Sequence, residues 1–184
     1  QALARHFEAV VGVDISRAMI DLAQRYNSAA GRCTYLVNDT NDLSQFADGA
    51  FTFVHSIIVL QHIRQPHSLN YVREFARVTA PGGAIVFQVP EKIPGDIAGS
   101  AQRSLRRLIN TSPFLVRAYR RIAFRRVAQE KLDAMPPHVL DMEPIDRRVV
   151  EEVLRGSGAR LLGITETGDM GFGLRSLLYV ALKN

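Results

Sequence analysis

Two aspartates follow directly after two short apolar runs of the kind that form buried strands. Asp14 ends the run that starts at Ala9, and Asp39 comes two residues after the run from Cys33 to Val37. If both runs are parallel strands, their carboxyl ends lie at one edge of a sheet, about 5 Å apart for neighbouring strands or about 10 Å apart otherwise. That span suits an adenosine.

The residue types around these acids match the polar groups of a nucleoside. A carboxylate accepts hydrogen bonds only, so Asp14 can take both hydroxyls of a ribose. Asp39 can accept from the exocyclic amine of adenine, while the Thr40 backbone N–H and the apolar Ile15 supply a donor and a hydrophobic face. The alternative for each aspartate is a helix N-cap or a turn residue.

The elements that would position these residues alternate regularly. The run that starts at Ala9 is continuous enough for a strand buried on both faces. A helix is predicted from Arg17 to Ala29, with Ser16 as its N-cap and Gly31 as its C-cap. Further strands at 33–37, 51–54 and 84–89, and a helix from Pro66 to about Val78, continue the pattern. It is typical of an α/β fold with a mostly parallel sheet and right-handed crossovers.

The second half of the chain departs from this alternation. Residues 95–140 form a basic insertion of two helices, the second starting at Pro113 behind a Ser112 cap. Asp146 caps a further helix, and the extended stretches 159–167 and 174–182 are too close for a crossover, so they should pair antiparallel. We therefore expect a core at residues 1–94, a helical insertion at 95–140, and a C-terminal helix and hairpin at 141–184 that complete the same domain.

The composition agrees with one globular domain. The 184 residues are 47% hydrophobic and 22% charged, which excludes a disordered or fibrous chain. The apolar stretches are far shorter than the roughly 20 residues that cross a bilayer. The lone Cys33 lies in an apolar run and is interpreted as a core residue, and without a second cysteine or a secretory signal pattern a cytoplasmic location is expected.

The net charge of +5 comes from one segment. Between Ser100 and Lys131, Glu130 is the sole acidic residue among nine basic ones, namely Arg103, Arg106, Arg107, Arg117, Arg120, Arg121, Arg125, Arg126 and Lys131. Three interpretations stay open: a lid over the active site, a peripheral contact with anionic lipid, or attraction of an anionic substrate. Nucleic acid is disfavoured as a partner because aromatic residues are few and RNA-binding motifs are missing.

Taken together, several segments resemble the class I S-adenosylmethionine-dependent methyltransferases. The matching segments, in order, are VVGVDIS at 10–16, VND at 37–39, FTFVHS at 51–56, LQHI at 60–63 and FARVTAPGG at 75–83. The resemblance implies a Rossmann-like sheet of seven strands whose last strand is inserted antiparallel between its neighbours. It also implies S-adenosylmethionine as cofactor, with Asp14 at the ribose and with His55 and Ser56 bordering the methionine portion.

One departure from the family lies at the start of the chain. The first strand of the family and its glycine-rich turn would precede Gln1. We therefore expect the natural protein to begin several tens of residues earlier. The 184 residues alone are expected to fold poorly, without cofactor affinity or activity.

The resemblance places one histidine near the transferred methyl group. His62 follows the strand at 51–56 by a few residues, and it is the first candidate for a base that removes the proton of a hydroxyl acceptor. His138, near Asp141 and Glu143, is the second. The alternative for both is an exposed or backbone-bonded histidine. No metal site is predicted.

The sequence therefore predicts a methyltransferase that acts on an oxygen, nitrogen or carbon atom of a small molecule. Two alternatives remain. A nicotinamide-dependent oxidoreductase also uses an acidic residue after its second strand, although Asp39 and the terminal hairpin argue against it. A methyltransferase-like module could also bind the cofactor without turnover. The oligomeric state is left open.

Overall fold

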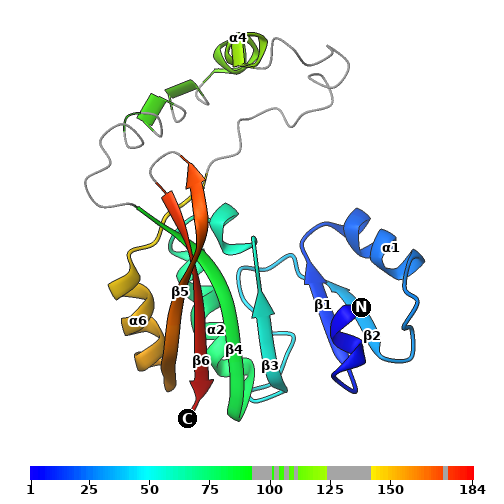
Figure 1. Ribbon diagram of the computed structural model, residues 1–184. Helices are drawn as coiled ribbons and strands as arrows, with labels where there is room; N and C mark the ends of the chain where they lie inside the picture. The colour runs from blue at the N-terminus through cyan, green and yellow to red at the C-terminus, as the bar shows by residue number, and fades with distance from the viewer. Residues whose placement is uncertain (93–100, 102–103, 106–107, 110–111, 124–141, 172–173) are drawn as a thin grey trace. The chain divides into compact units, whose positions relative to one another are not determined.

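The computed structural model describes residues 1–92, 101, 104–105, 108–109, 112–123, 142–171 and 174–184. It divides into two compact units, Gln1–Gln45 (unit 1) and Phe46–Asn184 (unit 2). Figure 1 shows their elements, which in chain order are η1 (Ala2–Arg5), β1 (Val10–Asp14), α1 (Arg17–Arg25), β2 (Cys33–Val37), β3 (Phe51–Ser56), η2 (Leu60–His62), α2 (His67–Val78), β4 (Thr79–Lys92), α4 (Pro113–Ala123), α6 (Arg147–Gly156), β5 (Ala159–Gly171) and β6 (Leu174–Lys183).

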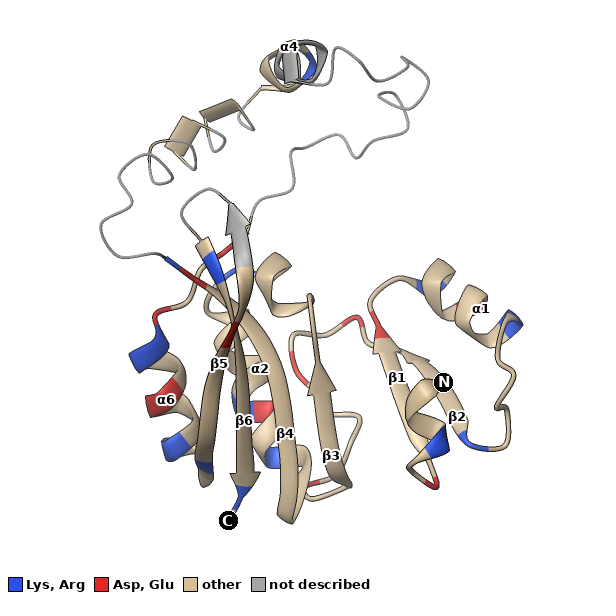
Figure 2. Cartoon of the chain, in the orientation of Figure 1, with Lys and Arg blue, Asp and Glu red and all other residues tan. Residues whose placement is uncertain are grey.

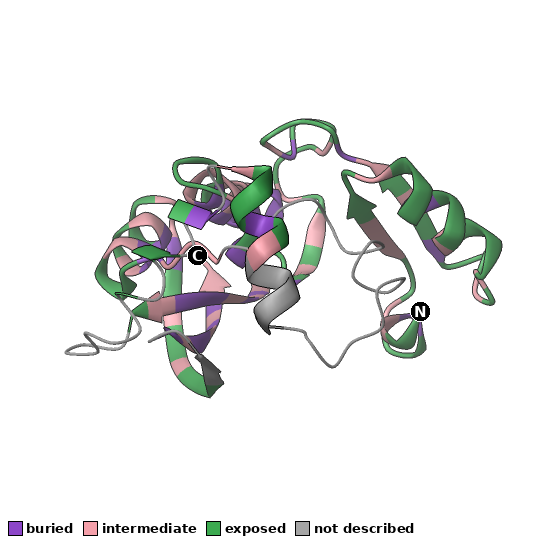
Figure 3. Cartoon of the chain, turned by 90° about the horizontal axis from the view of Figure 1, so that it is seen from above, coloured by how far each residue is buried: buried purple, intermediate pink, exposed green. Residues whose placement is uncertain are grey.

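Unit 1 is built on the parallel strand pair that the sequence predicts. β1 and β2 pair in register from Val10 opposite Cys33 to Asp14 opposite Val37. Cys33 is buried, as expected for a core residue. The prediction that the first strand is buried on both faces is wrong within this unit, because β2 is its single neighbouring strand and its residues are half-buried or exposed. Unit 1 is accordingly mostly exposed or intermediate in Figure 3.

α1 begins where the sequence predicts and ends earlier. The Ser16 hydroxyl accepts a hydrogen bond from the Met19 N–H, which confirms Ser16 as the N-cap. The helix ends at Arg25 with Tyr26 as its C-cap, so the prediction that Gly31 caps it is wrong. The reason is Asn27, whose side chain accepts from the Ala29 N–H at 3.0 Å and donates to the Cys33 carbonyl at 3.0 Å. These bonds give the backbone a turn in place of a further helical turn.

Unit 2 contains a four-stranded sheet in the order β3-β4-β6-β5. β3 and β4 are parallel, whereas β6 lies between β4 and β5 and is antiparallel to both. The predicted pairing of the two terminal stretches is therefore confirmed, and the last strand of the chain is inserted between its neighbours. In Figure 1 α2 lies behind the sheet and α6 lies beside β5, and the two helices contact each other as well as the sheet.

The core of unit 2 is formed by apolar side chains of the sheet and of its helices. The rings of Phe87 on β4 and Tyr179 on β6 stack with centroids 5.1 Å apart, and Phe75 of α2 packs on Phe87 at 6.0 Å. Val150 and Leu154 of α6 are also fully buried. Burial raises the pKa of the Tyr179 phenol above its ordinary value, so this group stays neutral and serves packing.

α4 and α6 begin where the sequence predicts, and α2 begins one residue later than predicted, at His67. The Asp146 carboxylate accepts from the Arg148 N–H at 2.8 Å at the start of α6, and α4 begins at Pro113. Figure 2 shows charges of both signs along α6, which fits a solvent-facing side. Most of the predicted insertion at 95–140 lies outside the described residues, and with it most of the basic side chains. Among the helices that the structure describes, none has the length and apolarity to span a membrane.

Candidate functional site

Within unit 1 the structure brings the two predicted acids to neighbouring strand ends. The Asn38 N–H donates to the Asp14 carbonyl at 2.9 Å, so the ladder between β1 and β2 runs up to the residue before Asp39. One Asp14 carboxylate oxygen accepts from the Ser16 N–H at 2.8 Å. Asp14 therefore takes part in the turn before α1, which was the structural alternative to ribose binding. Its carboxylate is exposed and can accept further hydrogen bonds.

The loop that carries Asp39 is held by an amide that the sequence analysis missed. The Asn38 side chain is buried, donates to the Asp42 carbonyl at 3.0 Å and accepts from the Gln45 side chain at 2.7 Å. The Thr40 hydroxyl is bonded within the same loop, at 3.0 Å from an Asp42 carboxylate oxygen. The signal in the sequence was an amide residue between an apolar strand and an acid, and its burial, which requires fixed hydrogen-bond partners, is visible in the folded chain.

Ile15 has the exposure that an adenine-packing residue needs. Its side chain is 73% exposed directly after Asp14. A flat apolar ligand that covers this side chain removes apolar surface from water, which favours binding. The residues at the end of β1 and after β2 thus provide an apolar surface and carboxylate acceptors in one small unit, which fits the chemistry of an adenosine.

His55 and Ser56 end β3 in unit 2 and differ in burial. His55 is exposed and lies on the same face as Phe53, with ring centroids 6.0 Å apart, whereas Ser56 is buried on the opposite face. The two residues pair with Val86 and Phe87 of β4. They therefore occupy the carboxyl ends of parallel strands, where open α/β sheets bind ligands.

His62 lies at the end of η2 and has an exposed side chain. Its Nε2 is 3.0 Å from the Nε2 of the Gln61 amide. The amide nitrogen can only donate, so this contact favours the tautomer with the proton on Nδ1. The buried Gln61 is a second residue that the sequence analysis missed, and its carbonyl accepts from the Glu143 N–H at 2.9 Å.

The connection between β3 and η2 contains an unusual backbone conformation. Ile58 has φ of 62°, and it is the sole non-glycine residue with positive φ among those that the structure describes. For a β-branched residue this conformation costs roughly 1–2 kcal/mol. The Ile58 N–H donates at 3.2 Å to the side-chain carbonyl of Gln88 on β4. Strained backbone conformations concentrate at functional sites, so the conformation of Ile58 points to a functional role for this connection.

The chain returns from the insertion at this same edge of the sheet. The Ile145 N–H donates to the Pro90 carbonyl at 2.9 Å, near the end of β4, and the Gln65 side chain donates to the Pro144 carbonyl at 3.3 Å. The return segment is thus attached to β4 and to the residues after η2. The second base candidate, His138, lies outside the described residues.

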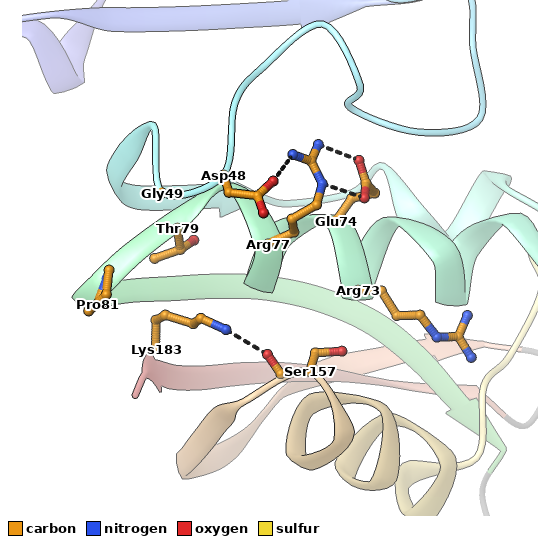
Figure 4. Close-up of a pocket in the computed structure, with 9 residues that line it drawn as sticks. All are labelled: Asp48, Gly49, Arg73, Glu74, Arg77, Thr79, Pro81, Ser157 and Lys183. Carbon is orange, nitrogen blue, oxygen red and sulfur yellow. Dashed lines mark hydrogen bonds and ion pairs between the residues drawn. The ribbon is translucent and has the colours of Figure 1, made fainter.

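A cavity of about 510 Å³ lies at the opposite edge of the unit 2 sheet. Figure 4 shows the side chains that line it. Arg77 of α2 makes two hydrogen bonds of 2.8 Å with Glu74 and one of 2.7 Å with Asp48. These bonds, those with Glu74 first, raise the pKa of Arg77 above its usual range. The Lys183 ammonium donates to the Ser157 carbonyl at 2.7 Å. None of the predicted site residues lines this cavity, and its ionic contacts are structural.

We expect Arg77→Met to destabilise the protein without changing ligand binding. Its guanidinium also donates to the Phe46 carbonyl at 2.9 Å, so the change removes several charged hydrogen bonds that are partly screened by solvent. A loss of about 2 kcal/mol is expected, or a fall in melting temperature of roughly 4–8 °C. The control is Arg73→Met, which removes an exposed arginine of the same helix and should leave the melting temperature unchanged. Equal melting temperatures for both variants would contradict the structural role assigned to Arg77.

Among the described residues, no group of three or more His, Cys, Asp or Glu side chains is placed to hold a metal ion.

Comparison with known proteins agrees with this architecture. Residues 1–87 match the family described as a methyltransferase domain. A protein from Pyrococcus horikoshii OT3 is 20% identical, with a TM-score of 0.62 over 100% of this chain and 75% of that one. A SAM-dependent methyltransferase from Methanosarcina mazei is 16% identical, with a TM-score of 0.63 over 95% and 82% of the two chains.

A third similar structure was determined with bound small molecules. It is geranyl diphosphate C-methyltransferase from Streptomyces coelicolor A3(2), in complex with Mg²⁺, geranyl diphosphate and S-adenosyl-L-homocysteine. It is 14% identical, with a TM-score of 0.61 over 100% of this chain and 65% of that one. A search of curated proteins found no significant match. The methyltransferase-domain match over residues 1–87 and the inserted antiparallel last strand both agree with the resemblance to the class I S-adenosylmethionine-dependent methyltransferases.

Proposed function

We propose that this protein binds S-adenosylmethionine and transfers its methyl group to an oxygen, nitrogen or carbon atom of a small molecule. The observation that carries the proposal is the pair of exposed acids at neighbouring parallel strand ends, Asp14 and Asp39, within the segment that matches the methyltransferase family. Support for a small acceptor comes from similar structures such as the geranyl diphosphate enzyme.

The residues at the ends of β1 and β2 fit the adenosine part of the cofactor. Asp14 would hold the ribose, because one of its oxygens is bonded to the Ser16 N–H and the carboxylate has acceptor sites left for hydroxyl donors. Asp39 and Thr40 would contact the adenine edge and the exposed Ile15 its face. His55 and Ser56 would border the methionine portion.

When bound, S-adenosylmethionine supplies a methyl group activated by a positively charged sulfur. The contribution of this chain is alignment, since a displacement in line with the acceptor gains most of its rate from orientation. If the acceptor is a hydroxyl, the His62 imidazole would remove its proton as the new bond forms. The Nε2 atom that would accept this proton is the one that faces the Gln61 amide at 3.0 Å, so the imidazole would turn away from that contact to act as a base.

The test is calorimetric titration of the full-length protein with S-adenosylhomocysteine and, separately, with NAD⁺. Saturable binding of the first and none of the second is expected; the reverse would establish the oxidoreductase alternative. Transfer of labelled methyl from S-adenosylmethionine to a panel of small hydroxyl, amine and carboxylate compounds follows. Binding without transfer to any acceptor would favour the silent module.

A further inference from the structure

The strained Ile58 is held by a polar network that spans three strands of unit 2. Gln88 of β4 accepts from the Ile58 N–H at 3.2 Å and donates from its amide to the Thr167 hydroxyl of β5 at 3.1 Å. The same amide donates to the Ser176 hydroxyl of β6. Thr167 in turn bonds the Ser176 hydroxyl at 2.7 Å. Every polar group of the Gln88 side chain is therefore used, which fixes its orientation.

Gln88 lies at the level where β3 ends. Ser56 pairs with Phe87, so Gln88 is the next residue along β4 and stands beside the start of the connection to η2. The Gln88 carbonyl thus holds one backbone N–H between Ser56 and His62, two of the predicted site residues. It is the single amide in the apolar run from Ala84 to Val89.

The conformation that Gln88 holds leaves two large apolar side chains in solvent. Ile58 is 61% exposed and Val59 is 50% exposed, at the carboxyl edge of the sheet. Without a partner, a β-branched residue would relax to negative φ. The combination of strain and exposed apolar surface indicates that the shape of this connection serves a ligand with an apolar part.

We infer that Gln88 is a positioning residue of the methyl-transfer site: it holds Ile58 and Val59 as an apolar wall for the methyl acceptor, which carries an apolar group beside the methylated atom. The inference rests on the proposed function for the identity of the ligand. The network that holds the wall is independent of it.

The first test measures hydrogen exchange of the Ile58 amide in the full-length protein. Gln88→Leu should raise the exchange rate about tenfold, because the acceptor is lost while Thr167 and Ser176 still bond one another. Gln88→Glu should restore protection, since a carboxylate oxygen can accept from Ile58 and both hydroxyls can donate to it. Gln65→Leu is the matched control, because Gln65 bonds the Pro144 carbonyl. Unchanged exchange in Gln88→Leu would overturn the inference.

The second test uses the acceptor found in the transfer panel. Gln88→Leu should raise the acceptor KM about tenfold, while the S-adenosylhomocysteine Kd stays within about twofold and Gln88→Glu recovers the acceptor KM. An unchanged acceptor KM would overturn the assignment of the wall, and a general loss of cofactor binding would point to a structural role. If the parent protein binds no S-adenosylhomocysteine, the proposed function fails, while the exchange of Ile58 still decides whether Gln88 holds the connection.

Discussion

Asp14→Asn is expected to weaken S-adenosylhomocysteine binding about 100-fold, because the ribose loses a charged acceptor for its two hydroxyls. The amide keeps one oxygen, which can still accept from the Ser16 N–H as the carboxylate does at 2.8 Å. The turn before α1 is therefore retained, and the fall in affinity reports the loss of charge. Calorimetric titration of the full-length protein measures it.

The control for this variant is Asp21→Asn, which neutralises an exposed acid of α1 in the same unit. It should leave the affinity for S-adenosylhomocysteine unchanged. Both variants should have the same melting temperature as the parent protein. If Asp14→Asn binds as tightly as the parent protein, Asp14 is a turn residue and the adenosine site must lie elsewhere.

His62→Ala is expected to lower turnover of a hydroxyl acceptor about 100-fold, at the lower end of what a general base contributes. The side chain is exposed on η2, so its removal should not disturb the core. Cofactor affinity should remain within about twofold, because the proposed adenosine contacts come from unit 1. Single-turnover methyl transfer with saturating cofactor separates the two effects.

The matched control is His67→Ala, which removes an exposed histidine at the start of α2. Turnover should persist in this variant. Equal turnover in His62→Ala and the parent protein would remove His62 from the mechanism and leave orientation of the acceptor as the source of the rate.

Local patterns in the sequence predict much of the fold. β2 matches the predicted strand from Cys33 to Val37, and the caps Ser16 and Asp146 are both confirmed. The antiparallel terminal pair is confirmed as well. These features depend on neighbours along the chain: periodicity selects the element, and a capping side chain satisfies N–H groups within three residues.

Two predictions, the end of α1 and the burial of β1, were wrong because they depend on contacts that the local pattern does not contain. Asn27 ends α1 before Gly31 by bonding the Cys33 carbonyl, six residues away. The half-buried β1 differs from the prediction because burial depends on how many strands and helices cover it, which apolar composition does not encode. A continuous apolar run is compatible with either degree of burial.

Some residues of the candidate site could be selected from the sequence, and others became visible only in the folded chain. Asp14, Asp39 and His62 could be selected from the sequence, because residue type and position after a strand already restrict their chemistry. The predicted roles of His62 and of the cofactor contacts stay predictions until the variants above are measured. Asn38 and Gln61 were missed because their importance comes from hydrogen bonds to residues that adjoin them in the folded chain.

The order of short apolar strands, capped helices and acids after strands was enough to predict an α/β fold similar to that of methyltransferases. It also selected candidate residues for a cofactor site, since each signal is contained in a few consecutive residues. The left-handed Ile58 and the Gln88 network emerged from the folded chain alone. Gln88, Thr167 and Ser176 are far apart in sequence, and they meet because β6 runs between β4 and β5. Hydrogen bonds between such residues form through sheet pairing, which no local pattern contains.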